Sequence, residues 1–428
     1  MKILHLVSQD FGGAGRAALR LHLALLDQAN AHPNESIESL MLVQEKSTDY
    51  KSVLRLAKTT SQKIMQKARP ALCRIPLIFY PKRHQDIFST DFIPNPHLIK
   101  TINHLQPDIV HLHWINNGFL NIKDLKKIKA PLLWSLHDSN AYTGGCHVVY
   151  PHCNQAQTHC QKCPFLKSHF KFDLSFWIFA KKAKTYSKLN LTINGLSRWI
   201  TQCAKESALL KDKKIINLPN PIDTNIYCPI PKDSARDILK LHQSQKIIAF
   251  GALSATSLAR KGYFELKEAL KFLKNKDRLK LVIFGASGDE NGETPDVSGI
   301  QTHYLGHLQD DISLRLVYSA ADVMVTPSLC ESFGQTASES LSCGTPVVCF
   351  DTSGLKDIID HQKTGYLAKA FDPLDLARGI EWVLGLDPQA YQSLSQEGRK
   401  KVLTTFNAQK IAKQYIQNYK EILNAPTS

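Results

Sequence analysis

Short apolar segments rich in β-branched and aromatic residues alternate with helical patterns along the whole chain. Segments of this kind fit the buried strands of parallel sheets, whose faces are covered by helices. The strands expected in the first half are residues 2–7, 37–43, 109–113, 132–137, 191–196 and 214–218, and those expected in the second half are residues 246–251, 280–285, 302–304, 323–326 and 345–350. The pattern predicts an α/β fold with two doubly wound, Rossmann-like halves.

Two domains are also expected from size, because 428 residues with 43% apolar content are too many for one ordinary core. Pro229 and Pro231 begin a polar stretch that discourages regular structure, so we place the boundary after Cys228. The expected domains are residues 1–228 and 229–407. Residues 408–428 have a helical apolar spacing with no strand after them, and we expect this helix to pack back across the interdomain region.

The formal net charge of +15 is unevenly distributed. Residues 51–84 contain nine Lys or Arg and no acid, and residues 162–188 interleave seven Lys and one acid with six Phe or Trp. Such segments mark an anionic membrane surface or a nucleic-acid site, or they form a solvated basic face whose aromatic side chains pack inward. No nucleic-acid motif accompanies the charge, so we expect no nucleic-acid partner and keep the other two interpretations.

The sequence lacks a run of about 20 apolar residues, and the opening apolar segment at residues 1–7 has only the length of a strand. We therefore expect a cytoplasmic protein, either free or peripheral on the inner face of the membrane. The ten cysteines fit this location if they remain thiols or bind metal, because cytosolic disulfides are uncommon.

The second half contains the residue types of a phosphate and ribose site. After the strand at 323–326 come Glu331, Ser332, Phe333, Gly334 and Gln335, and then Glu339 in a predicted helix. A strand, a loop with a carboxylate and a glycine, and a helix with a second carboxylate are how α/β proteins build such sites. Arg260 and Lys261 follow the strand at 246–251, where two adjacent cations suit a diphosphate or form a plain surface pair. Together these residues predict a nucleotide-sugar pocket.

In the first half, the first strand ends in a glycine-rich turn that contains Gly15 and leads directly into a helix. Such a turn lets the backbone approach a phosphate or sugar, although a tight turn can need glycine for its own geometry. His137 ends a strand, at the edge of the sheet where ligands bind, and the same holds with less force for His113, Trp114 and Asn116. A core or capping histidine is the alternative for His137.

Several motifs follow one another in a fixed order. They are Phe250-Gly251, Arg260-Lys261-Gly262, Leu281-Val282-Ile283-Phe284-Gly285, Leu305-Gly306, Tyr318-Ser319-Ala320-Ala321-Asp322-Val323, Pro327-Ser328, Glu331-Ser332-Phe333-Gly334, Glu339, Gly344-Thr345-Pro346-Val347-Val348 and Gly365-Tyr366-Leu367. This order resembles the retaining glycosyltransferases of family 4. The resemblance covers nearly the whole chain and implies the GT-B fold, in which two Rossmann-like doubly wound domains face a central cleft.

The resemblance also implies roles for these residues, with His137, Arg260, Lys261 and Glu331 as the catalytic group. Arg260 and Lys261 look like the diphosphate clamp, although the family often has an arginine where this chain has Ala252. Glu331 and the backbone of residues 332–335 would hold the donor sugar and phosphate, and Glu339 would take the ribose hydroxyls. Leu308 falls where the family contacts the base, Gly15 would approach the donor, and His137 would contact the transferred sugar.

The implied function is a hexosyltransferase that moves a hexose from a nucleotide diphosphate sugar to a hydroxyl of a glycan or lipid-linked glycan, in cell-surface polysaccharide biosynthesis. The family is thought to use a front-face route, in which the departing diphosphate helps to deprotonate the acceptor. No divalent metal or other cofactor is then required, because Arg260 and Lys261 supply positive charge. The alternatives are a GT-B nucleotide-sugar 2-epimerase and a nucleotide-sugar-binding protein without catalysis.

Four cysteines form a second constellation, and they are Cys146, Cys153, Cys160 and Cys163. Four thiolates suit a structural zinc ion, although the spacing of the first pair is wider than usual, and free thiols, disulfides or a redox role are the alternatives. Similar Cys-rich insertions occur in a subgroup of the resembled family that builds bacterial polysaccharides, including colanic-acid-type enzymes.

Overall fold

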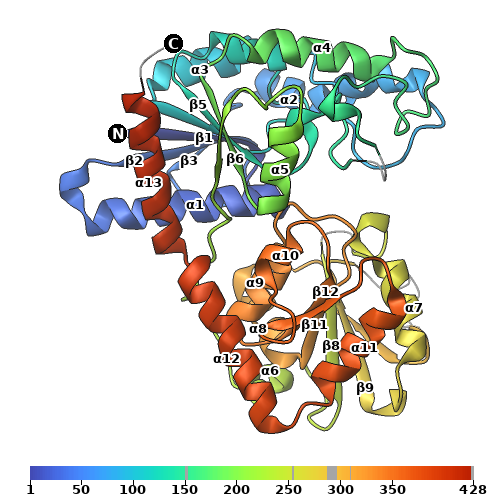
Figure 1. The fold of residues 1–428 in the computed structure, drawn as a ribbon. Coiled ribbons are helices and arrows are strands. Elements are labelled where there is room, and N and C mark those ends of the chain that lie inside the picture. Colours follow the sequence, from blue (N-terminus) through green and yellow to red (C-terminus); the bar gives the residue numbers. More distant parts are fainter. Residues whose placement is uncertain (150–152, 253–254, 287–295, 309, 426–428) are drawn as a thin grey trace. The chain divides into compact units, whose positions relative to one another are not determined.

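The computed structural model describes residues 1–149, 153–252, 255–286, 296–308 and 310–425. The chain forms two compact units, of which one comprises Met1–Pro219 together with the chain from Ile411 on, and the other comprises Asn220–Lys410. Each unit contains a parallel sheet with helices on both faces (Figure 1). The predicted pair of doubly wound α/β domains is confirmed.

The first unit is built on a seven-stranded parallel sheet in the order β3-β2-β1-β4-β5-β6-β7. Its strands are β1 (Lys2–Gln9), β2 (Glu38–Glu45), β3 (Val53–Arg55), β4 (Ile109–Leu112), β5 (Leu132–Leu136), β6 (Leu191–Gly195) and β7 (Lys214–Asn217). Its α-helices are α1 (Gly12–Ala31), α2 (Thr60–Arg74), α3 (Pro96–Leu105), α4 (Leu174–Tyr186) and α5 (Arg198–Glu206). Helix α1 covers one face of the sheet, and α3 and α4 cover the other (Figure 1).

The last helix, α13 (Ala408–Asn424), belongs to the first unit from Ile411 on. Tyr415 and Tyr419 are buried, and the Tyr419 hydroxyl lies 2.7 Å from Nδ1 of His111 in β4. Residues 426–428 of the expected helix lie outside the described residues.

The second unit is built on a six-stranded parallel sheet in the order β10-β9-β8-β11-β12-β13. Its strands are β8 (Lys246–Gly251), β9 (Leu279–Phe284), β10 (Gln301–Tyr304), β11 (Val323–Thr326), β12 (Val347–Phe350) and β13 (Gly365–Ala368). Its α-helices are α6 (Lys232–Ile238), α7 (Tyr263–Phe272), α8 (Asp311–Ala320), α9 (Gln335–Ser342), α10 (Leu355–Ile358), α11 (Pro373–Leu384) and α12 (Pro388–Thr405). Helices α7 and α11 pack together on one face, and α6, α8 and α9 lie on the other (Figure 1).

The division between the units falls after Pro219 rather than after Cys228. The reason is Ile222, which is fully buried and pairs with the chain that follows α12. Its amide donates to the Phe406 carbonyl at 2.8 Å, and its carbonyl accepts from the Ala408 amide at 2.9 Å. The stretch before Pro229 is therefore part of the second unit.

None of the described helices combines the length and the apolar character that a membrane crossing requires. Both sheets reverse their winding direction once, between β1 and β4 in the first unit and between β8 and β11 in the second. In sheets of this kind, ligands bind outside the carboxyl ends of the strands at the reversal point. A ligand site is therefore expected at the residues that follow β1, β4, β8 and β11.

Candidate active site

In the second unit, two loops at the reversal point contact each other through their backbones. One loop follows β8 and ends in the short 3-10 helix η6 (Ala259–Lys261), and the other follows β11. Gly262 has a φ of +76°, and a Cβ added to it would lie 1.8 Å from the Pro327 carbonyl oxygen. The Leu329 amide donates to the Arg260 carbonyl at 2.9 Å. Only glycine allows this approach, which brings the cations of one loop beside the carboxylate of the other.

Lys261 and Glu331 form the charged centre of this arrangement. The Lys261 Nζ atom lies 2.5 Å from Oε1 of Glu331, and the two side chains are only 15% and 17% exposed. Burial alone would raise the pKa of Glu331, but the charges of Lys261 and then Arg260 outweigh it, so the pKa lies below its usual value. Glu331 is therefore a carboxylate at neutral pH.

The start of α9 is held beside Glu331 by two further glycines. Gly334, at the N-cap, has a φ of +109°, and a Cβ there would lie 2.7 Å from Cδ2 of Leu355. The Gly354 amide donates to the Glu331 carbonyl at 2.9 Å, and the Glu331 amide donates to Oγ of Ser353 at 2.9 Å. The N-terminus of a helix carries partial positive charge, which suits this end of α9 to a phosphate.

The other residues predicted for this loop have different environments. Ser332 and Gln335 are half-buried, whereas Phe333 is buried and packs edge-on against Phe406, with the ring centroids 5.4 Å apart. A contact through Phe333 is thus restricted to its backbone.

Glu339 and Leu308 complete the residues predicted for the second unit. Glu339 is 3% exposed, and its Oε2 accepts a hydrogen bond from the Tyr318 hydroxyl in α8 at 2.7 Å. Leu308 is half-buried in the loop after β10, an edge strand that is separated from β8 by β9. The structure therefore brings Arg260, Lys261, Glu331 and the start of α9 together, and places Leu308 at a different strand end.

In the first unit, Gly15 lies in the first turns of α1, directly after β1. A Cβ at this position would lie 2.3 Å from the Gln9 carbonyl oxygen, so the close approach of α1 to the strand end requires glycine. Gly13, in the same turn, is exposed, and a Cβ there would meet no heavy atom within 4 Å. The packing of the turn is sufficient to account for Gly15.

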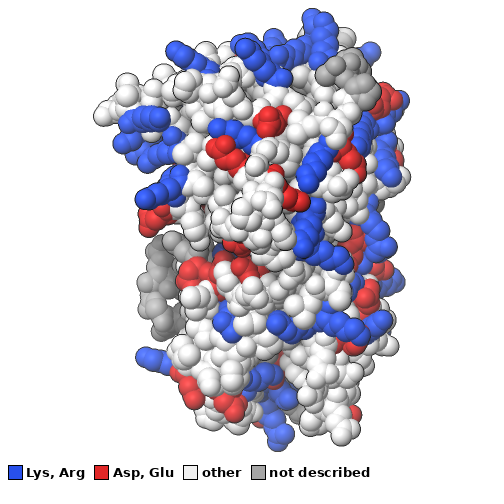
Figure 2. Space-filling model, turned by 90° about the vertical axis from the view of Figure 1, so that its left-hand side faces the viewer, with Lys and Arg blue, Asp and Glu red and all other residues white. Residues whose placement is uncertain are grey.

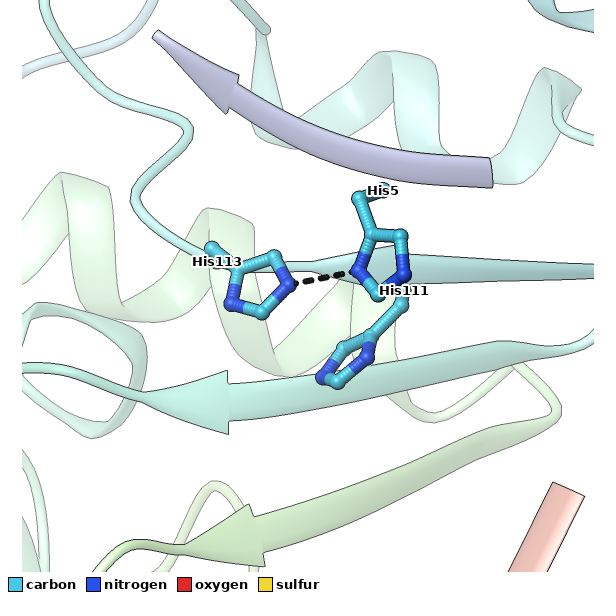
Figure 3. A group of neighbouring side chains, drawn as sticks. All are labelled: His5, His111 and His113. Atoms are coloured by element: carbon cyan, nitrogen blue, oxygen red, sulfur yellow. Dashed lines mark hydrogen bonds between the residues drawn. The ribbon is translucent and has the colours of Figure 1, made fainter. Parts of the chain in front are cut away.

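His137 follows β5 and is the outer end of a chain of three imidazoles. Its Nε2 lies 3.0 Å from Nδ1 of His113, and Nε2 of His113 lies 3.0 Å from Nδ1 of His5. Figure 3 shows the inner part of this chain, with His111 beside it. Burial lowers the pKa of His137 to about 4 and lowers the pKa of His113 and His5 as well. All three rings are therefore neutral at pH 7.

The direction of hydrogen-bond donation along the three imidazoles follows from the innermost ring, His5. Nε2 of His5 is buried and has no hydrogen-bond partner among the described residues. A buried N–H without an acceptor is rarer than a buried acceptor without a donor, so we infer that His5 carries its proton on Nδ1. Each ring then donates outward from Nδ1, and His137 presents an Nδ1–H donor at the end of β5.

Among the described residues, His5, His111 and His113 are the one group of three or more metal-ligand side chains whose ligand atoms lie within 4.8 Å of one another. Both ring nitrogens of His113 are used in the imidazole chain, and those of His111 contact the hydroxyls of Tyr419 and Ser135 at 2.7 and 2.8 Å. A divalent cation there would have only neutral ligands in the core. The contacts favour the hydrogen-bonded chain.

Sequence reasoning missed a polar network around the loop after β5. Nε1 of Trp114 donates to Oδ2 of Asp138 at 2.7 Å, and Nδ1 of His147 lies 2.5 Å from the same oxygen. Burial would raise the pKa of Asp138, but His147 and the hydrogen bonds lower it. Lys182, which is 1% exposed, donates to the Thr143 carbonyl at 3.1 Å. Trp114 comes shortly after β4 and Asp138 shortly after β5, and these two strands are neighbours in the sheet. This placement is the feature of the sequence that could have indicated the network.

All ten cysteines are free thiols. Cys146, Cys153, Cys160 and Cys163 do not place three sulfur atoms within 4.8 Å of one another, whereas the sulfurs of a tetrahedral zinc site are about 3.8 Å apart. Burial raises the pKa of Cys146 to about 12. In this arrangement the four sulfur atoms do not form a zinc-sized group, and structural zinc stays a prediction.

Residues 232–401 match the family model of glycosyl transferases group 1. A glycosyltransferase of Methanocaldococcus jannaschii is 31% identical over 217 residues, which are 49% of this chain and 54% of that protein. The chain thus spans about half the length of the curated relatives it matches.

Several solved structures resemble nearly the whole chain, and two of them illustrate the similarity. Sucrose-phosphate synthase from Thermosynechococcus elongatus has a TM-score of 0.69 at 17% identity and covers 98% of both chains. The Anabaena protein HepE in complex with UDP-glucose has a TM-score of 0.61 at 15% identity, covering 98% of this chain and all (100%) of that one. At such identities the likeness establishes the fold. Residues 232–401 thus resemble the glycosyl transferases group 1 family, and the chain has the GT-B fold.

Proposed function

We propose that this chain is a retaining glycosyltransferase that moves a hexose from a nucleoside diphosphate sugar to a hydroxyl of a glycan. The observation that carries the proposal is the Lys261–Glu331 pair at the reversal point of the second sheet, inside the region that matches the glycosyl transferases group 1 model. A half-buried cation and a half-buried carboxylate at one strand edge offer partners for a diphosphate and for sugar hydroxyls, respectively.

For the donor, we assign the diphosphate to Arg260, Lys261 and the amides at the start of α9. Positive charge at this point stabilises the negative charge that grows on the diphosphate as the glycosidic bond breaks. We assign no metal ion to this step, because Arg260 and Lys261 already supply the positive charge. The Anabaena neighbour in complex with UDP-glucose supports a nucleotide sugar as the donor class.

Glu331 is assigned to the hexose and Glu339 to the ribose. The lowered pKa of Glu331 keeps it an acceptor for sugar hydroxyls at neutral pH. Glu339 already accepts from Tyr318 through Oε2, so a ribose hydroxyl would use the remaining acceptor capacity of the carboxylate. Leu308 is assigned to a backbone contact with the base. The loop after β10, which contains Leu308, would then determine which base is bound.

In the first unit, we assign His137 to the transferred sugar as a neutral donor and Gly15 to the donor through its backbone. Retention by double displacement needs a free nucleophilic carboxylate. The carboxylate next to His137 is Asp138, whose Oδ2 is engaged by Trp114 and His147. This favours a front-face route, in which the leaving diphosphate takes the proton of the acceptor hydroxyl.

We further assign the acceptor to a lipid-linked glycan and the pathway to cell-surface polysaccharide synthesis, with the protein peripheral on the inner face of a membrane. The support is the mixture of basic and apolar residues in 51–84 and 162–188. The two alternative functions are a nucleotide-sugar 2-epimerase and a nucleotide-sugar-binding protein without catalysis.

Product analysis separates these three functions. The full chain is incubated with UDP-, GDP- and ADP-sugars, with and without a lipid-linked glycan fraction, and the products are examined by NMR and mass spectrometry. A transferase yields a nucleoside diphosphate and one glycosylated acceptor with the anomeric configuration of the donor, and only when acceptor is present. An epimerised sugar formed without acceptor would identify the epimerase, and donor binding without any product would identify the binding protein.

A further inference from the structure

Helix α2 presents polar side chains to the protein and apolar side chains to the outside. Its buried residues are Gln66, Arg69 and Cys73. Arg69 donates to the backbone carbonyls of residues 93, 94 and 118, so α2 is attached mainly through polar contacts. By contrast, Ile64 is 65% exposed and Met65 is 54% exposed. This is the reverse of the burial expected for a helix on a soluble protein.

The exposed side of α2 has two distinct sectors. At about 100° per residue, Ile64, Met65 and Leu72 fall within an arc of about 100°. Lys63, Lys67 and Arg74 fall within an arc of about 40°, next to the apolar one. An apolar arc beside a basic arc is the pattern of helices that lie in the plane of a membrane interface.

The apolar exposure continues beyond α2 into the 3-10 helix η2 (Ile75–Phe79), where Ile78 is 70% exposed and Phe79 is 82% exposed. A second segment adds Phe170, Phe172 and Trp177, which are 79%, 60% and 60% exposed. The alternative interpretation, in which the aromatic side chains pack inward, is therefore wrong for these residues.

The two segments lie side by side in the first unit. Leu77 of η2 is buried in one small core with Phe165 and Ile178. The Tyr80 hydroxyl accepts from the Leu174 amide at 3.0 Å, and the His84 amide donates to the Phe165 carbonyl at 2.8 Å. Residues 60–82 and 167–177 thus belong to neighbouring segments, and we name their exposed side chains together the basic–apolar surface.

The exposed charge of the basic–apolar surface is entirely positive. Its exposed cations are Lys63, Lys67, Arg74, Lys82, Lys167 and Lys171. Its one acid, Asp173, is 2% exposed and is used to cap α4, where Oδ1 accepts from the Phe176 amide at 3.1 Å. The face drawn in Figure 2 differs, since Asp and Glu are interspersed there with Lys and Arg.

Charge and exposure together select the partner. A nucleic acid would pair with the cations but would leave Ile64 and Phe79 without an apolar environment. A twofold dimer through this surface would bring two sets of cations together. A bilayer with anionic lipids offers phosphate groups to the cations and an acyl boundary to the apolar side chains at the same time.

We propose that the basic–apolar surface docks in the headgroup region of a bilayer that contains anionic lipids. The purpose of this docking, which is to bring the first unit to a lipid-linked acceptor, rests on the proposed function. The docking itself does not depend on that function, because it can be measured with neither donor nor acceptor present.

The test is sedimentation of the full chain with phosphatidylcholine vesicles, with and without phosphatidylglycerol. One variant combines Ile78→Ser with Phe79→Ser, and its control combines Phe264→Ser with Ile312→Ser, which are 67% and 66% exposed in the second unit. A second variant combines Lys63→Gln, Lys67→Gln and Arg74→Gln, and its control changes the exposed residues Lys211, Lys240 and Lys274 to Gln. All changes are at exposed positions, and unfolding curves verify the fold.

The expected result is binding to the anionic vesicles that weakens with salt. Each basic residue near an anionic surface contributes about fivefold, so the triple Lys and Arg variant should bind roughly 100-fold more weakly, with its control close to the parent chain. Equal or negligible binding to both vesicles, or equal losses in variants and controls, would overturn the proposal. So would a dimer that the Ile78 and Phe79 variant dissociates. Donor titration of the same variants reports the proposed function independently.

Discussion

The Lys261 ammonium and the Glu331 carboxylate already satisfy each other across 2.5 Å. A diphosphate that approached Lys261 would take over part of this hydrogen bonding, and a Glu331 oxygen would then be available for a sugar hydroxyl. In the proposed site, one ammonium group would therefore couple the binding of the diphosphate to the binding of the sugar.

The pKa of Glu331 should depend more on Lys261 than on Arg260. Burial raises this pKa and the two cations lower it, Lys261 by more, so Lys261→Ala should move it upward further than Arg260→Ala does. Because the folded-state pKa lies below the unfolded one, the pair stabilises the fold above the unfolded pKa, and this contribution is lost as the pH falls through the folded value. A carboxyl ¹³C NMR titration measures both shifts. A larger shift in Arg260→Ala, or none in either variant, would contradict the assignment.

Single residues differ in how far the sequence alone could predict them. Lys261 and Glu331, which the structure brings together, could be selected as candidates from the order of their motifs, and their roles stay a prediction. The partners of His137 were not, because His113 and His5 reach it only through the neighbouring positions and register of β1, β4 and β5. The register pairs His5 with His111, which is 106 residues further along the chain, and no local spacing contains that information.

At the scale of elements, the eleven expected strands are all present, with ends that differ by a few residues. Two strands, β3 and β13, were not expected. Both are edge strands of three or four residues with partly exposed side chains, so they lack the continuous apolar run of a strand that is covered on both faces. The polar inward face of α2 could not be predicted either, because it depends on backbone carbonyls from other segments.

The junction of β1 and α1 offers a matched pair of glycines two residues apart. Gly15→Ala should destabilise the chain by about 1–3 kcal/mol, because the new Cβ would lie 2.3 Å from the Gln9 carbonyl. Gly13→Ala, with open space around its Cβ, should be neutral or stabilise the chain by up to about 1 kcal/mol. Urea unfolding of both variants measures the difference. Equal stability of the two variants would show that α1 begins elsewhere.

At the scale of the whole molecule, neutral histidines that are buried or, in the case of His137, half-buried are concentrated in the first unit. They are His5, His22, His111, His113 and His137, and burial is the leading cause of the lowered pKa of each. The pKa is about 4 for both His22 and His137. Among the described residues of the second unit, burial lowers the pKa of half-buried His303.

The first unit should therefore lose stability first on mild acidification. Between the unfolded pKa of about 6.5 and a folded pKa of about 4, the unfolded chain binds protons that the folded chain does not. Stability falls as the pH falls through this window, by up to about 1.4 kcal/mol per pH unit for each histidine. Four of the five tryptophans, Trp114, Trp134, Trp177 and Trp199, lie in the first unit and report its unfolding by fluorescence.

Urea unfolding of a Trp382→Phe variant, repeated at several pH values, gives the number of protons taken up. His22→Gln in the same background should reduce that number by about one, because it removes one histidine whose pKa is lowered. A stability of the first unit that stays constant from pH 6.5 to pH 4.5 would contradict the neutral state of the five histidines.

The central claim is that the second unit binds a nucleoside diphosphate sugar through the Lys261–Glu331 pair. The most direct measurement is calorimetric titration of the full chain with UDP-, GDP- and ADP-sugars, compared with Lys261→Ala and, as an exposed control in the same unit, Lys274→Ala. Loss of a charge-assisted hydrogen bond predicts roughly 10- to 100-fold weaker binding of one donor class by Lys261→Ala and unchanged binding by Lys274→Ala. Absence of binding to every donor, or equal affinity of the parent chain and Lys261→Ala, would contradict the claim.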